Sequence, residues 1–332
     1  MACTTPACGD LGRDCIHLDP LTSPETRHDN RCPTSHHRTG GLMSARVVLV
    51  TGSSTGIGEA TALLFARRGD TVYATMRTPD TSGEALRRTG EAEGLDLTLL
   101  ALDVNDDHSV ARGIGSAMER SGPIDVLVNN AGVGNLTSVE EVSLEDAKAV
   151  FETNLFGALR TMKAVLPSMR ERRSGTIVNV TSISGRLVSG GHGMYSSSKY
   201  ALEALSEATA LETRRHGLRV IIVEPGFIST PILDKAGKPL DPDGPYAEVL
   251  SRMLGMYTHA RANAEPPSVV AEAIERALDD PEPKLRYLVG AGAEQTVLAR
   301  EAASDELWIE QGAELTVEEL QEWQARVFPP RD

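Results

Sequence analysis

Tyr195 and Lys199 are the side chains of this sequence best suited to move a proton at neutral pH. They are four positions apart in a segment predicted to be helical, 194–216, so both would lie on one face of the helix. A phenol alone is a poor base because its pKa is about 10, but a neighbouring ammonium group stabilises the phenolate and lowers that pKa. The pair could pass a proton to or from a hydroxyl or carbonyl oxygen, although this spacing alone often occurs by chance.

Three further polar residues stand where a ligand could meet them. Ser182 lies thirteen residues before Tyr195, just beyond the apolar segment 175–181, which predicts a strand. Asn130 follows another predicted strand in the same way. Ligands of a doubly wound sheet bind at the carboxyl ends of its strands, so Ser182 could donate a hydrogen bond to a substrate oxygen. Asn154 lies within a predicted helical region, where asparagine is a poor helix former without some other reason.

A glycine-rich turn near the start of the chain predicts a dinucleotide site. The four apolar residues 47–50 predict a strand buried on both faces, and residues 59–68 predict a helix. Between them stand Gly52, Gly56 and Gly58. Glycines let the backbone turn tightly and approach a pyrophosphate, while the helix N-terminus offers free N–H groups to that anion.

Strands and helices alternate along the rest of the chain. This alternation predicts an α/β fold, namely a Rossmann-type, doubly wound, parallel seven-stranded sheet with helices on both faces. The predicted strands are residues 47–50, 71–76, 96–102, 125–129, 175–181, 218–224 and 285–289. The other predicted helices are residues 82–93, a helix capped by Asn105 that runs to about Arg120, residues 143–172 and residues 268–278.

Two stretches interrupt this alternation of strands and helices. Residues 226–266 form a long connection with scattered apolar residues, which is typical of a substrate-binding loop or lid. The acidic tail, 301–332, has a capping box at Thr316 and Glu319 followed by apolar residues at helical spacing, which predicts a helix packed on the domain; an oligomer contact is the alternative. We therefore expect a Rossmann-fold domain over residues 44–300 with a helical tail.

The first 43 residues differ from the rest. They contain all four cysteines and no periodic apolar pattern, so we expect a disordered leader rather than a disulfide framework or a metal site. The net charge of −14 argues against non-specific nucleic-acid binding. No apolar run approaches the length of a membrane span, and the N-terminus has no apolar core of a signal peptide, so we expect a cytoplasmic protein.

Together these motifs resemble those of the short-chain dehydrogenase/reductase family over about residues 45–290. The matching motifs, in family order, are Thr51-Gly-x-x-x-Gly-x-Gly58, Asn129-Asn-Ala-Gly132, Asn154, Ser182, Tyr195-x-x-x-Lys199 and Pro225-Gly226. The expected strand order is 3-2-1-4-5-6-7. Residues 72–77 and 283–287 resemble the 17β-hydroxysteroid and retinol dehydrogenase branch, which acts on bulky apolar alcohols and carbonyls.

The resemblance implies roles for individual residues. Tyr195 would be the general acid/base, Lys199 would lower its pKa and hold the nicotinamide ribose, and Ser182 would orient the substrate oxygen. Asn154 would anchor a water in a proton relay through Lys199. No metal is required. The implied cofactor-binding residues are Tyr195 and Lys199, then Gly52, Ser54, Thr55, Gly56, Ile57 and Gly58 at the diphosphate, Asp103 and Val104 at the adenine, Asn130 at its ribose, and Ile228 and Thr230 at the nicotinamide amide.

The end of the second predicted strand bears on the choice of cofactor. Met76 stands where the family's NAD-selecting aspartate would stand, and Arg77 follows it. Arginine suits a 2′-phosphate because its planar fork can donate two parallel hydrogen bonds. Asp80, the nearest acid, lies beyond Pro79 and is expected to point to solvent. The sequence thus favours NADP(H), with NAD(H) possible.

We expect an NADP(H)-dependent oxidoreductase acting on a hydrophobic, steroid-like or retinoid-like alcohol or ketone, as a homodimer or homotetramer. A 3-oxoacyl thioester reductase is the rival enzyme, because it would share the same catalytic residues. A non-catalytic NADP(H)-sensing protein is the rival of another class. His192 is interpreted as a loop residue rather than a catalyst, because the proton chemistry already has its groups.

Overall fold

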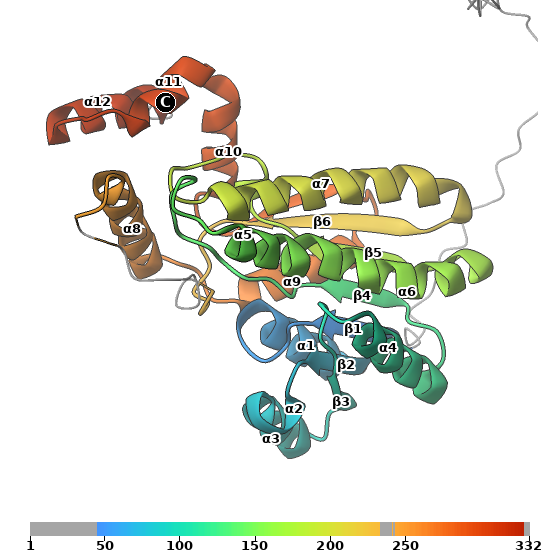
Figure 1. Cartoon of the computed structure of the whole chain (residues 1–332). Coiled ribbons are helices and arrows are strands. Elements are labelled where there is room, and N and C mark those ends of the chain that lie inside the picture. The colour runs from blue at the N-terminus through green and yellow to red at the C-terminus, as the bar shows by residue number, and fades with distance from the viewer. Residues whose placement is uncertain (1–44, 233–240, 242, 329–332) are drawn as a thin grey trace, which may run out of the picture. The chain divides into compact units, whose positions relative to one another are not determined.

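The computed structural model describes residues 45–232, 241 and 243–328 (Figure 1). The leader expected at 1–43 lies outside these residues. The sheet has seven parallel strands in the order β3-β2-β1-β4-β5-β6-β7, which confirms the predicted fold class and strand order. The strands are β1 (Val47–Thr51), β2 (Thr71–Met76), β3 (Leu97–Ala101), β4 (Val126–Asn129), β5 (Thr176–Val180), β6 (Arg219–Pro225) and β7 (Arg286–Val289).

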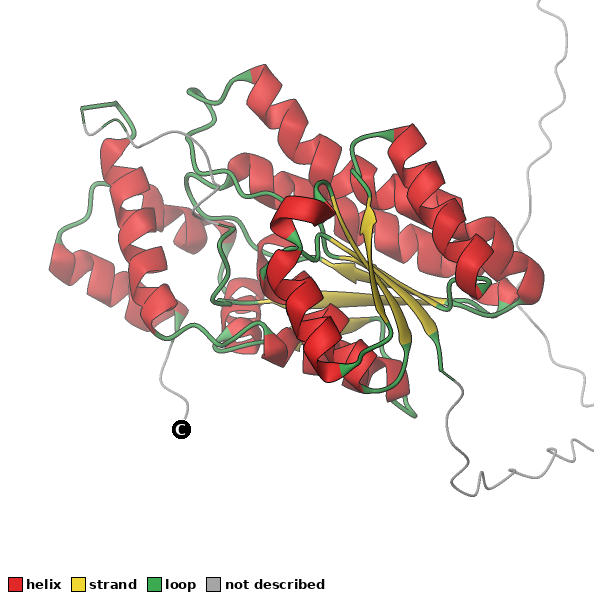
Figure 2. Ribbon diagram, turned by 90° about the horizontal axis from the view of Figure 1, so that it is seen from below, coloured by secondary structure: helices red, strands yellow, loops and turns green. Residues whose placement is uncertain are grey.

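Helices cover both faces of the sheet (Figure 2). Successive side chains of a strand point to opposite faces, so Val48 packs with α1 (Gly56–Arg67) and α9 (Ser268–Asp279). Leu49 packs instead with side chains of helices on the other face, α4 (Asp107–Ser121) and α6 (Gly157–Arg172). The apolar run of β1 is therefore buried on both sides, and it holds the glycine turn that follows it.

The remaining helices lie around this core. They are α2 (Pro79–Ser82), α3 (Glu84–Glu93), α5 (Leu144–Phe151), α7 (Gly193–Thr213), α8 (Ala247–Ala262), α10 (Ala293–Ala302), α11 (Asp305–Ile309) and α12 (Val317–Val327). A π-helical turn, η1 (Glu152–Phe156), joins α5 to α6, and a short 3₁₀ helix, η2 (Ile183–Gly185), follows β5. In the part of the chain that the structure describes, no helix is long and apolar enough to cross a bilayer.

The structure differs from the sequence prediction at two helix starts. The helix predicted at 82–93 is α3, which begins at Glu84, and a separate short helix, α2, ends just before Gly83. The cap of α4 is Asp106 rather than Asn105, because Asp106 accepts a hydrogen bond from the backbone of Ser109 at 2.6 Å. The Asn105 side chain instead donates to Thr153 at 3.1 Å. Adjacent Asn and Asp residues are both good caps, so the sequence alone did not distinguish them.

The connection at 226–266 contains a helix, α8, which the sequence analysis did not predict. Leu250 and Met253 are buried, and with Tyr257 they follow helical spacing. The proline- and glycine-rich residues around this segment obscured the pattern. Residues 233–240 and 242 of the connection lie outside the described residues.

The tail helices pack on the domain. Trp308 and Trp323 form an apolar cluster with Val297 of α10 and with Ile183 and Leu187, which follow β5. The capping box predicted at the start of α12 is present: Thr316 and Glu319 each bond the backbone of the other.

Candidate active site

The carboxyl ends of the strands surround a cavity of about 520 Å³. The side chains that line it come from the glycine turn, the ends of β2 to β6, the start of α7, α8 and the tail helices. Of the predicted site residues, those that line it are Gly52, Ser54, Thr55, Gly56, Ile57, Arg77, Asp103, Val104, Asn130, Ser182, Tyr195, Lys199, Ile228 and Thr230. Gly58 and Asn154 lie just behind its wall.

The glycine turn leaves no space for side chains. A Cβ atom at Gly52, where φ is +68°, would lie 2.7 Å from the Cα of Ala131 at the end of β4. A Cβ at Gly58 would lie 2.4 Å from the Gly52 carbonyl oxygen. The N-cap of α1, Thr55, makes no side-chain capping bond, so free N–H groups begin this helix beside the cavity. This cradle fits the diphosphate of a dinucleotide.

Asn130 braces the same turn. Its side-chain nitrogen donates to the carbonyl oxygens of Thr51 at 2.9 Å and Gly52 at 3.1 Å. The Thr51 hydroxyl accepts hydrogen bonds from the backbones of Asn130 and Ala131, each at 3.0 Å. The ends of β1 and β4 are thereby locked together where the expected cofactor would lie.

Tyr195 and Lys199 extend from the first turns of α7 into the cavity. The Lys199 ammonium lies 5.8 Å from the centroid of the Tyr195 ring and donates to the Val180 carbonyl at 3.0 Å. Burial lowers the pKa of Lys199 to about 8, and Glu203 opposes this shift. Burial raises the pKa of the Tyr195 phenol, and a hydrogen bond with Ser182 acts in the opposite direction. Burial thus outweighs the Ser182 hydrogen bond, and the net shift is opposite to the lowering expected from Lys199.

Ser182 is held by the turn after β5. Its hydroxyl accepts a hydrogen bond from the Ser184 backbone at 3.1 Å and lies 3.5 Å from the Pro225 carbonyl oxygen. The side chain is buried, and it lies close enough to Tyr195 to form a hydrogen bond. The two hydroxyl groups can therefore contact one substrate oxygen.

Asn154 lies in the π-helical turn η1, which explains why an asparagine stands between two helices. Its carbonyl oxygen accepts from the Val133 backbone at 2.8 Å, and its amide donates to the Val133 carbonyl and to the Ser198 hydroxyl, both at 3.0 Å. A Cβ at Gly132 would lie 3.3 Å from the Asn154 oxygen and 3.8 Å from the Lys199 nitrogen. The side chains of Asn154 and Lys199 are therefore neighbours.

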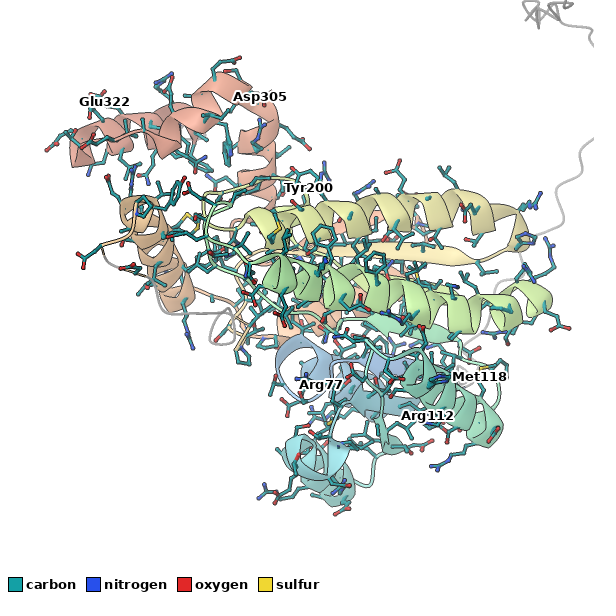
Figure 3. All side chains as sticks on the ribbon, in the orientation of Figure 1. Arg77, Arg112, Met118, Tyr200, Asp305 and Glu322 are labelled. Carbon is teal, nitrogen blue, oxygen red and sulfur yellow. The ribbon has the colours of Figure 1, made fainter. Side chains whose placement is uncertain are left out.

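The end of β2 presents a basic side chain. Met76 is buried at the cavity wall, and Arg77 is exposed and makes no ion pair within the described part of the chain (Figure 3). Asp80 points to solvent, as expected, where it pairs with Arg87 at 3.4 Å. A phosphate group at this edge would thus meet Arg77 without a competing carboxylate from β2.

The sequence analysis did not foresee one contact inside the cavity. His192 directly precedes α7, outside the helix as expected, but it is buried, and its Nδ1 lies 2.8 Å from the Tyr257 hydroxyl of α8. Its ring packs edge-on against Tyr195, with centroids 5.5 Å apart, and Tyr257 packs against Phe227. Burial lowers the pKa of His192 to about 4, so this histidine is neutral at physiological pH. No local pattern marks this contact, because His192 and Tyr257 are far apart in sequence.

The tail also lines the cavity, which the sequence analysis did not foresee. Its contributing side chains are Trp308, Gln311, Trp323, Gln324 and Phe328. The helical spacing of the tail predicted a buried face but not the surface that it would cover.

The chain resembles a large group of oxidoreductases. The family described as short chain dehydrogenase matches residues 46–241. Oxidoreductase BOA17 of Botryotinia fuckeliana is 35% identical over 281 residues, which cover 80% of this chain and 97% of that protein. Retinol dehydrogenase 8 of Bos taurus is 37% identical over 73% of this chain and 80% of its own. This relative agrees with the resemblance of residues 72–77 and 283–287 to the 17β-hydroxysteroid and retinol dehydrogenase branch. The 3-ketodihydrosphingosine reductase of Bacteroides thetaiotaomicron is 32% identical (75% and 89% covered).

Solved structures give the same result. A short-chain dehydrogenase from Streptomyces avermitilis is 34% identical with a TM-score of 0.69, covering 85% of this chain and 96% of its own. An alcohol dehydrogenase from Thermococcus sibiricus in complex with 5-hydroxy-NADP is 28% identical, with a TM-score of 0.62 and coverage of 74% and 97%. A short-chain dehydrogenase/reductase from Burkholderia phymatum in complex with NAD is 25% identical, with a TM-score of 0.69 and coverage of 77% and 93%.

The extent of the family match and the identity to relatives covered over most of their length settle the family. The glycine cradle and the uncapped start of α1 fit a nicotinamide dinucleotide. The chain therefore belongs to the short-chain dehydrogenase family, and it is an oxidoreductase that acts on CH–OH or C=O groups with a nicotinamide cofactor.

Proposed function

We propose that this protein is an NADP(H)-dependent oxidoreductase that interconverts a hydrophobic ketone and the corresponding alcohol. The observation that carries the proposal is one cavity lined by Ser182, Tyr195 and Lys199, by the glycine cradle and by several apolar side chains. A binding protein that only sensed the cofactor would have no need for a buried hydroxyl pair beside a lysine.

Each residue has a distinct part in the proposed reaction. Ser182 donates a hydrogen bond to the substrate oxygen, and Tyr195 gives that oxygen its proton during reduction or removes it during oxidation. Lys199 places a positive charge near the phenol and is positioned to hold ribose hydroxyls. Asn154 would hold a water near Lys199 that returns the proton to solvent. The bound nicotinamide supplies or accepts the hydride.

The apolar part of the cavity lining supports an apolar substrate. Its side chains include Leu187, Phe227, Ile232, Met256 and Tyr257. Methionine and aromatic side chains adapt to apolar ligands of irregular shape. Two relatives are named for hydrophobic molecules, retinol and 3-ketodihydrosphingosine, which agrees with this wall.

NADP(H) is the proposed cofactor because Arg77 ends β2 without an ion-pair partner among the described residues. Arginine can bind a phosphate through two parallel hydrogen bonds. The buried Met76 leaves no carboxylate to repel that phosphate.

A screen of ketones with NADPH, followed by the loss of its absorbance, tests the proposal. We expect turnover of cyclic and fused-ring ketones and little turnover of sugars or short hydroxy acids. Activity confined to an acyl thioester would favour the 3-oxoacyl thioester reductase. A protein that binds NADPH tightly but reduces no carbonyl compound would be the non-catalytic sensor.

A further inference from the structure

The C-terminal segment, residues 305–328, returns to the cavity that contains Tyr195. The family match ends at residue 241, so this segment belongs to a part of the chain that the match does not cover. We infer that it forms the far wall of the substrate site and selects elongated, apolar ketones and alcohols with more than one ring or a long chain. This inference rests on the proposed function and names its substrate class more closely.

The two tryptophans present aromatic surface to the cavity. The indole N–H of Trp308 donates to the Val188 carbonyl at 2.8 Å, and that of Trp323 donates to the Leu307 carbonyl at 2.6 Å. Because both N–H groups are already bonded, the parts of the rings that line the cavity are carbon atoms. The guanidinium carbon of Arg300 lies over the Trp308 ring, 5.4 Å from its centroid, so this face of Trp308 is covered. Their centroids are 6.0 Å apart, and the Phe328 ring lies 6.4 Å from that of Trp323. The rings are inclined to one another by 60° and 79°, so together they form an angled apolar surface rather than a flat one.

This aromatic wall is continuous with the reacting end of the cavity. Ile183 follows Ser182 directly, and Ile183 and Leu187 pack in the same apolar cluster as Trp308 and Trp323. Ile183 and Leu187 also line the cavity. We therefore place Ile183 and Leu187 between Ser182 and the tryptophans, so that a long substrate with its oxygen at Ser182 would contact all four side chains. A single-ring substrate would occupy the near end alone.

Hydrogen bonds with α8 hold the C-terminal segment in place. Arg252 of α8 donates to the carbonyl oxygens of Gln311 at 3.2 Å and Ala313 at 2.9 Å. In Figure 1, α11 and α12 lie beyond α10, on the side where α8 stands. The segment is thus a fixed part of the site, and a substrate need not order it before binding.

Tryptophan fluorescence tests this placement without any turnover. Trp308 and Trp323 are the two tryptophans of the sequence, and both line the cavity. The protein would be titrated in the presence of NADP⁺ with a saturated steroid ketone and, separately, with cyclohexanone. We expect a saturable change in emission with the steroid ketone and almost none with cyclohexanone. Trp308→Phe and Trp323→Phe should each keep part of the signal.

Kinetics with a series of ketones give the second test. Phe328→Ala should lower kcat/KM for the steroid ketone about tenfold while changing that for cyclohexanone by less than about twofold. The matched control is Glu322→Ala, which changes an exposed side chain of α12, the helix that Phe328 follows (Figure 3). It should leave kcat/KM unchanged for both ketones. Melting temperature and NADPH affinity would be measured on each variant.

Two results would overturn the inference. One is a steroid ketone that is reduced or bound with no change in tryptophan emission. The other is an equal fall in kcat/KM for cyclohexanone and for the steroid ketone when Phe328→Ala leaves the melting temperature unchanged. If no ketone is reduced at all, the proposed function fails, and the fluorescence titration still decides whether this wall binds the steroid ring system.

Discussion

At the scale of single residues, two opposing influences act on the pKa of Tyr195, the proposed general acid/base. Burial raises the pKa of Tyr195, and the Ser182 hydrogen bond lowers it. The phenol therefore keeps its proton at neutral pH and is ready to donate it to a substrate oxygen. This protonation state favours ketone reduction under those conditions, whereas oxidation must first remove the proton.

Lys199 should set an alkaline limit to ketone reduction. Its pKa is lowered to about 8, so its positive charge is present below that pH and is lost as the pH rises through it. We expect kcat/KM for reduction to be level below about pH 8 and to fall above it. Lys199→Arg keeps the charge at any accessible pH and should remove that fall, although its overall rate will be lower. A pH profile of Lys199→Arg that still declines near pH 8 would assign the limit to another group.

The role of Tyr195 can be separated from its contribution to the fold. Tyr195→Phe removes the phenol oxygen and should lower kcat by about a hundredfold or more, with NADPH affinity unchanged. Tyr200 lies on the same helix, is 41% exposed and does not line the cavity, so Tyr200→Phe is the control (Figure 3). Steady-state kinetics and calorimetric titration of NADPH would be compared. Near-normal turnover in Tyr195→Phe would remove this residue from the mechanism.

At the scale of elements, we propose that the residues at the end of β2 select NADP(H) over NAD(H). We expect NADP(H) to be preferred by about tenfold in catalytic efficiency, or about 1.4 kcal/mol. Replacing both Met76→Asp and Arg77→Ala should reverse the preference, because a carboxylate would bind ribose hydroxyls and repel a 2′-phosphate. Catalytic efficiencies with both cofactors, for wild type and double variant, check this. A wild type that uses both equally would disprove the interpretation of Arg77.

The contact between His192 and Tyr257 joins the start of α7 to α8. Tyr257→Phe removes the hydroxyl that forms a hydrogen bond with His192. The imidazole then has no hydrogen-bond partner among the described residues, so we expect a loss of about 1 kcal/mol of stability. We expect KM for a steroid ketone to rise several-fold, since α8 carries part of the apolar wall. Thermal unfolding and KM would be measured together. An unchanged KM would mean that this contact does not help to position α8 for the substrate.

The elements that the sequence predicted well share a physical reason. The buried strands are short runs of β-branched and aliphatic residues, and a parallel sheet brings their carboxyl ends to one edge, so Ser182, Asn130 and the glycine turn could be placed together in advance. The π-helical turn at Asn154 gave a weaker signal, because the sequence indicated only that an asparagine was out of place in a helix. Helix α8 was missed because the segments on either side of it, 242–245 and 266–267, are rich in proline and glycine.

At the scale of the whole domain, the site depends on contacts between distant parts of the chain. Trp308 bonds the carbonyl of Val188, which is 120 positions away, and His192 meets Tyr257 across 65 positions. Helical spacing in the tail predicted that one face would be buried, but spacing holds no information about the surface that this face covers. The grouping of residues around Tyr195 and the connection at 226–266 could therefore be expected from the sequence, while the part of the cavity lined by the tail required the folded structure.

The central claim is that hydride passes from NADPH to a ketone carbon while Tyr195 supplies the proton. The most direct measurement uses NADPH dideuterated at C4 of the nicotinamide, a saturated steroid ketone and mass spectrometry of the alcohol. We predict one deuterium on the carbinol carbon per turnover in wild type, and about a hundredfold less product with Tyr195→Phe. An alcohol without deuterium, or no oxidation of NADPH by any hydrophobic ketone, would contradict the claim.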